Sequence, residues 1–168
     1  MTADMLEDAV ATYQGPLIGY ANSILGNFES ARDVVQDTFF RLSQQDTDRV
    51  SSGIKPWLYT VCRNRSLDLL RKQKRMRLGS EEEMMYLESG DPSPSEVHLQ
   101  NELHKQVLLY MDRLTDNQRE VIQLKFQSDL SYREIATITG LSESNVGFLI
   151  HAGLKRLRGW MVEFTTNR

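Results

Sequence analysis

The chain has 168 residues, and its hydrophobic fraction of 40% is enough to build the core of one ordinary domain or of two small ones. Its formal net charge of −3 is unusual for a protein that binds nucleic acid unaided, because neutralising phosphates normally requires a basic excess. Any DNA binding must therefore come from local charge or from a partner. An acidic start and the lack of a long apolar run favour a soluble, cytoplasmic protein that does not insert directly into a membrane.

Helical spacing dominates the sequence, and no run of alternating β-branched residues is bounded by hairpin turns, so we expect an all-α fold. In the first half, apolar residues over 10–24 are spaced as in an amphipathic helix, and those over 31–42 as in a second. A third helix is expected from just after Gly53 to about residue 76, because Pro56 suits a first helical turn.

Residues 78–97 combine acidic side chains with Gly, Pro and Ser, which is typical of a flexible linker. The acids lack the fixed spacing or the histidine partners of a metal site, so we expect a solvated acidic tether and no bound metal. This linker divides the chain into two small helical domains, expected over residues 5–77 and 98–164.

The second domain is expected to start with a helix over 97–114, and Thr115 then opens the next helix with a capping-box pattern. The segment 131–150 has the pattern of a helix-turn-helix, in which Gly140 permits a left-handed turn and Ser142 caps the second helix. The second helix would bury Val146, Ile150, Gly153 and Leu157. Its opposite face, which could enter a major groove, would carry Ser144, Phe148, His151 and Lys155. An ordinary helical hairpin without DNA is the alternative.

The segment from Pro56 to Arg75 is predicted to be a basic amphipathic helix. Such helices bind membranes or acidic partners as well as DNA, and a run of charge is more often only a solvated face. Trp57 and Tyr59 could stack on unpaired bases, although Trp57 is favoured as a core residue. The only cysteine, Cys62, cannot form an internal disulfide and is expected to pack in the core.

The helix over 31–42 places Phe39 and Phe40 at adjacent angles around its axis. Only one of two neighbouring aromatic residues can easily face a single core, which makes the other a candidate for a protein interface. Partial burial of both rings is an equally open alternative.

Nothing in the sequence has the pattern of a catalytic site. Neither a glycine-rich phosphate loop nor a nucleophile elbow is present, and His98, His104 and His151 lack ligand partners at useful spacing. We therefore expect neither an enzyme nor a bound cofactor.

Taken in order, the helix over 31–42, the basic helix and the helix-turn-helix resemble the extracytoplasmic-function sigma factors of bacteria, over nearly the whole chain except the linker. The resemblance implies a subunit that binds core RNA polymerase and directs transcription initiation at promoters. The first helix resembles the one that docks on a coiled coil of the clamp in the largest polymerase subunit. The implied contacts are Asp33, Gln36, Asp37 and Phe39.

By the same resemblance, the basic helix would recognise and melt the minus-ten promoter element, and the second helix of the helix-turn-helix would bind the minus-thirty-five element. A loop over about 44–55, with Asn64, would hold a flipped base. The implied minus-ten contacts are Arg63, Asn64, Arg65, Asp68, Arg71 and Lys72. The implied minus-thirty-five contacts are Ser144, Asn145, Phe148, His151 and Lys155.

The sequence departs from the family pattern at Gly147, Leu149 and Ala152, where members commonly carry basic residues. We therefore expect fewer positive side chains to contact the phosphates of duplex DNA, and a weaker affinity for it. The resemblance also implies control by a separate anti-sigma factor. The main alternative is a stand-alone DNA-binding regulator that uses only the helix-turn-helix. That alternative leaves residues 31–75 without a role.

Overall fold

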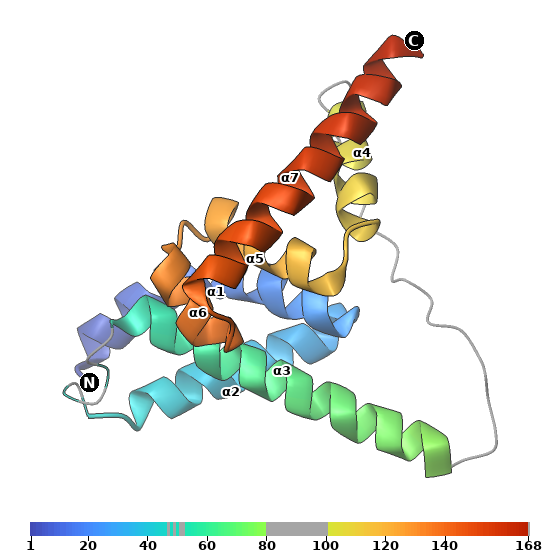
Figure 1. Ribbon diagram of the computed structural model, residues 1–168. Helices are drawn as coiled ribbons and strands as arrows, with labels where there is room; N and C mark the ends of the chain where they lie inside the picture. The colour runs from blue at the N-terminus through green and yellow to red at the C-terminus, as the bar shows by residue number, and fades with distance from the viewer. Residues whose placement is uncertain (47, 49, 51–52, 80–100, 168) are drawn as a thin grey trace. The chain divides into compact units, whose positions relative to one another are not determined.

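The computed structural model describes residues 1–46, 48, 50, 53–79 and 101–167 (Figure 1). Within these ranges the chain forms α-helices and no β-strand. It divides into two compact units, Met1–Pro92 and Ser93–Arg168. The prediction of an all-α fold made of two small helical domains is therefore confirmed.

The first unit consists of α1 (Ala3–Leu25), α2 (Phe28–Ser43) and α3 (Ile54–Gly79), each of which packs on the other two. Only two residues separate α1 from α2. Gly26 ends α1 with a φ of 65°, a left-handed conformation that glycine adopts without strain. Asn27 then caps α2, because its side chain accepts a hydrogen bond of 2.8 Å from the backbone N–H of Ser30.

The core of the first unit lies where the three helices meet. The rings of Tyr20 on α1 and Tyr59 on α3 lie 5.3 Å apart, and leucines of all three helices are buried in this unit. Tyr59 is only 1% exposed, so the expectation that it could stack on an unpaired base is wrong. Trp57 is partly buried. The buried leucines are Leu17, Leu25, Leu42 and Leu58.

Cys62 is fully buried in this core, as expected, and burial raises the pKa of its thiol to about 12. The reactive thiolate is therefore almost absent near neutral pH. We expect a thiol reagent at about pH 8 to leave the folded protein unlabelled and to label one thiol per chain after denaturation, as counted by mass spectrometry. Rapid labelling of the folded protein would show that this core opens readily.

The second unit consists of α4 (Asn101–Asp112), α5 (Asp116–Phe126), α6 (Tyr132–Thr139) and α7 (Glu143–Thr166), the first three of which all pack on α7. The core between α5, α6 and α7 is formed by buried aliphatic side chains. Farther along α7, the Trp160 ring lies 5.8 Å from that of Tyr110 on α4, and the Arg113 guanidinium lies 4.4 Å above Trp160. The buried aliphatic residues are Val121, Leu124, Leu130, Ile135, Val146 and Ile150.

The predicted start and stop signals of these helices are confirmed. Thr115 and Ser131 each form a complete capping box, with Gln118 and Glu134 respectively. Gly140 ends α6 with a φ of 75°, and the Ser142 hydroxyl then accepts a hydrogen bond of 3.1 Å from the backbone of α7. These local contacts fix the turn of the helix-turn-helix.

The expected boundaries differ slightly from the observed helices. Helix α3 continues to Gly79, so residues 78 and 79 belong to the helix and not to the predicted linker over 78–97. The rest of that linker lies outside the described residues, as does His98. Helix α7 extends to Thr166, two residues beyond the predicted end of the second domain.

Candidate protein and nucleic-acid interfaces

Helix α2 presents a polar face with one exposed aromatic ring. Asp33 and Gln36 are exposed, and Asp37 is partly exposed. Phe39, which the sequence analysis placed among the contacts to polymerase, is buried with 8% of its surface exposed, whereas Phe40 is 62% exposed. On the face that carries these polar side chains the exposed aromatic ring is therefore Phe40, and the choice of Phe39 is corrected. Phe28, at the start of α2, is 57% exposed as well.

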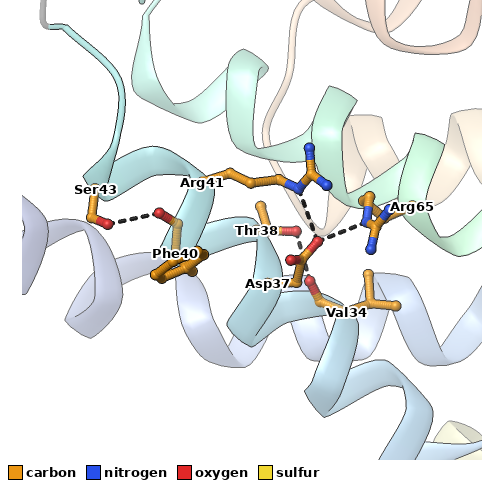
Figure 2. Close-up of polar contacts among 7 residues, drawn as sticks. All are labelled: Val34, Asp37, Thr38, Phe40, Arg41, Ser43 and Arg65. Carbon is orange, nitrogen blue, oxygen red and sulfur yellow. Dashed lines mark hydrogen bonds and ion pairs between the residues drawn. The ribbon is translucent and has the colours of Figure 1, made fainter.

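Two arginines hold the carboxylate of Asp37 (Figure 2). Its Oδ2 lies 2.9 Å from Nε of Arg41, one turn along α2, and 2.7 Å from Nε of Arg65 on α3. The first is a hydrogen-bonded ion pair within one helix, and the second is an ion pair between two helices. A residue expected to bind polymerase and a residue expected to bind DNA are thus in direct contact.

A shallow groove runs between α2 and α3 on this side of the first unit. Its α2 wall carries Asp33 and Asp37, and its α3 wall carries Arg65, Asp68 and Lys72. Three acidic and two basic side chains line the groove, so its net charge is slightly negative. Such a groove is poorly suited to a DNA strand, whose phosphates require a basic excess.

The opposite side of α3 is basic. At about 100° per residue, Arg63 and Arg65 lie about 160° apart around the helix axis, so they cannot contact the same strand in the same way. Of the exposed residues, Lys74 lies about 20° and Arg71 about 80° from Arg63 around the axis, whereas Asn64 and Arg75 lie about 100° and 120° from it. Arg71 forms a 3.0 Å ion pair with Asp68, but both side chains are largely exposed and the pair is weak. Lys74 was missed in the sequence analysis, although helical spacing from Arg71 would have indicated it.

The predicted base pocket over 44–55 is only partly described, because residues 47, 49, 51 and 52 lie outside the described residues. Within this loop Val50 is buried, and Gly53 has a φ of 96° just before α3 begins. Asn64, its predicted partner, is exposed on the basic side of α3.

In the second unit, the face predicted for duplex DNA is exposed. The predicted residues Ser144, Asn145, His151 and Lys155 are all exposed, and Phe148 is 69% exposed. The predicted inward residues Val146, Ile150 and Gly153 are buried, whereas Leu157 is only partly buried.

Glycine at 153 lets α7 approach α5 closely. A Cβ atom there would lie 2.6 Å from Cδ1 of Ile122, far inside van der Waals contact. The family pattern predicts basic side chains at three positions that are all partly buried here: Gly147, Leu149 and Ala152. Gly147 faces the Tyr132 ring, which a Cβ atom would meet at 3.3 Å. None of these three positions supplies a positive charge to DNA, and the exposed basic residues of α7 are Lys155, Arg156 and Arg158.

Two further properties bear on function. In the part of the chain that the structure describes, no group of three His, Cys, Asp or Glu side chains is placed to hold a metal ion. Among the same residues, no helix combines the length and the apolar character needed to cross a membrane.

Both units match known families. Residues 9–76 match the Sigma-70 region 2 family, and residues 104–157 match the Sigma-70, region 4 family. The chain is 30% identical to the RNA polymerase sigma factor SigV of Bacillus subtilis, over 94% of this chain and 91% of that protein. It is 28% identical to the ECF RNA polymerase sigma factor SigM of the same organism, over 91% of this chain and 93% of that protein.

Two solved structures share the fold. The sigma factor RpoE of Bartonella quintana, in complex with the anti-sigma factor NepR, aligns with a TM-score of 0.68 at 23% identity, over 95% of this chain and 98% of that chain. CnrH, in complex with the cytosolic domain of CnrY, aligns with a TM-score of 0.63 at 24% identity, over 96% of this chain and 90% of that chain.

A region 2 followed by a region 4 defines the sigma subunits of RNA polymerase, which bind the core enzyme and promoter DNA and are not enzymes themselves. The chain belongs to the extracytoplasmic-function (ECF) sigma factors. It directs transcription initiation at specific promoters. The alternative of a stand-alone helix-turn-helix regulator is not favoured, because region 2 has no role in it.

Proposed function

We propose that α2 of this sigma factor docks on the clamp of core RNA polymerase through Asp33, Gln36, Asp37 and Phe40. The observation that carries this assignment is the exposure of one large aromatic ring beside a row of polar side chains on a well-packed helix. An exposed aromatic residue in such surroundings is typical of a protein interface. The buried side of α2, which carries Ala31, Val34, Val35, Thr38, Phe39 and Leu42, packs in the core and is not available to a partner.

The basic side of α3 would receive the opened minus-ten element. Arg63, Arg71 and Lys74 do not line the groove beside α2, so an interface with polymerase on α2 and one with DNA on this side of α3 do not compete for the same surface. The exposed face of α7 in the second unit would contact the minus-thirty-five element. Domain limits close to 5–77 and 98–164 remain our assignment for these two activities.

The test of this division is reconstitution from purified components. The chain should bind immobilised core polymerase, and run-off transcription from a promoter library should require both to be present. Transcription start sites mapped after overexpression would then give the promoter sequence. DNA binding by the chain alone, with no effect of polymerase, would support an operator-binding protein instead.

Asn64→Ala tests the base pocket directly. If Asn64 helps to hold a flipped base, its loss should slow promoter opening about tenfold or more, because the unstacking of that base is no longer offset. Affinity for core polymerase should be unchanged, since Asn64 is exposed on α3 and does not line the groove beside α2. Permanganate footprinting measures opening, and titration with labelled core measures affinity. Equal loss of both would count against the pocket.

We also propose that a separate anti-sigma factor controls this protein in the cytoplasm, where polymerase and promoters are found. The two solved structures named above are complexes: one holds the sigma factor RpoE with the anti-sigma factor NepR, and the other holds CnrH with the cytosolic domain of CnrY. A protein that copurifies with the tagged chain and displaces core polymerase in competition would identify this partner. A copurifying protein that binds alongside polymerase would not.

A further inference from the structure

We propose that Arg65 is a positioning residue for the docking of polymerase, which holds Asp37 in place, and that it is not a contact to promoter phosphates. The inference rests on the proposed role of Asp37 at the polymerase interface. Arg65, which was expected to bind DNA from α3, would instead support the proposed polymerase interface on α2.

The first argument is the geometry of the ion pair. Nε of Arg65 has almost no exposed surface and lies 2.7 Å from Oδ2 of Asp37. The atom is thus directed toward α2 and away from solvent (Figure 2). A phosphate of a DNA strand would have to displace this carboxylate to reach it. The two atoms do not meet with hydrogen-bond geometry, so the contact is a close ion pair between α2 and α3.

The second argument is the place of Arg65 on α3. It faces the groove whose walls carry Asp33, Asp37 and Asp68, and lies about 160° around the helix from Arg63. A strand that follows Arg63, Arg71 and Lys74 leaves Arg65 on the far side of the helix. A strand in the groove would meet three carboxylates.

The third argument concerns what Arg65 does for Asp37. Arg41 lies on the same helix as Asp37, so its hydrogen bond of 2.9 Å to the carboxylate cannot fix α2 relative to α3. Arg65 reaches across from α3 to the same oxygen, and it is the contact that holds the carboxylate in place relative to that second helix. When the side chain is already ordered, docking loses less conformational entropy, a difference worth about threefold to tenfold in Kd.

The experiment compares the affinity of core polymerase for Arg65→Ala, Arg65→Lys and the matched control Arg41→Ala. We expect Arg65→Ala to raise the Kd for core about threefold to tenfold and Arg41→Ala to change it less than twofold. Arg65→Lys should restore part of the affinity, because the contact uses a single nitrogen that an ammonium can replace. At saturating core, promoter opening by Arg65→Ala should equal that of the parent protein, whereas Arg63→Ala should impair opening.

A double-mutant cycle with Asp37→Ala separates positioning from general stability. If Arg65 acts through Asp37, Arg65→Ala should have no further effect on polymerase affinity in the Asp37→Ala background. An equal effect in both backgrounds overturns the proposal, as does impaired promoter opening at saturating core. Thermal unfolding of each variant, followed by circular dichroism, identifies any loss of affinity that comes from unfolding, and such a loss would also overturn it.

The same cycle keeps this inference apart from the proposed function. If Asp37→Ala binds core as tightly as the parent protein, the docking role of Asp37 fails and the role of Arg65 fails with it. If Asp37→Ala weakens binding but Arg65→Ala does not, only the positioning role is lost.

Discussion

Replacing Asp37 with arginine is expected to abolish binding to core RNA polymerase. The change removes the carboxylate from the proposed interface and places a third positive charge beside Arg41 and Arg65. Like charges brought together at an interface cost several kcal/mol, so we expect the Kd to rise roughly a hundredfold or more. A titration of fluorescent core polymerase with the variant measures this loss.

The control for this variant is Glu7→Arg, the same charge reversal at an exposed position on α1. Both variants should keep the helix content of the parent protein in circular dichroism, because neither side chain belongs to the buried core that holds the three helices together. Polymerase binding by Asp37→Arg at parental affinity would move the interface to another face. An equal loss in both variants would show that net charge alone is responsible.

The double substitution of Arg71→Glu with Lys74→Glu is expected to have the largest effect on promoter DNA. Both side chains are exposed on the basic side of α3. Each phosphate contact that is lost removes about one unit from the slope of log K against log salt, so the slope should fall by about 2 or more. Promoter binding by the holoenzyme, measured across a salt series, checks this.

The affinity of this double variant for core polymerase should remain unchanged, since neither side chain lies on α2. Lys105→Glu, a charge reversal on α4 in the second unit, is the control for the change in net charge. A salt slope equal to that of the parent holoenzyme would contradict the assignment of the basic side of α3 to DNA.

The parts of the fold that depend on local chemistry could be predicted from the sequence. The helix-turn-helix is the clearest case, because the Ser131 capping box, the left-handed Gly140 and the Ser142 cap each involve residues within four positions of one another. The buried stripe of Val146, Ile150 and Gly153 followed from helical periodicity alone.

Features that depend on contacts between helices could not be predicted in this way. Phe39 and Phe40 differ by one step around α2, and only the packing of α1 and α3 decides which ring is buried. Tyr59 has the composition of a base-stacking residue but packs against Tyr20 on another helix. The pairing of Arg65 with Asp37 joins residues 28 positions apart, and no local pattern indicates it.

The buried thiol of Cys62 also makes the protein convenient for spectroscopy. Because the chain has one native cysteine and its sulfur is shielded, a second cysteine placed on an exposed site such as Ser144 would be the preferred point of attachment for a maleimide dye. The native residue would not need to be replaced. Fluorescence from such a probe could then follow each unit separately as an initiation complex assembles.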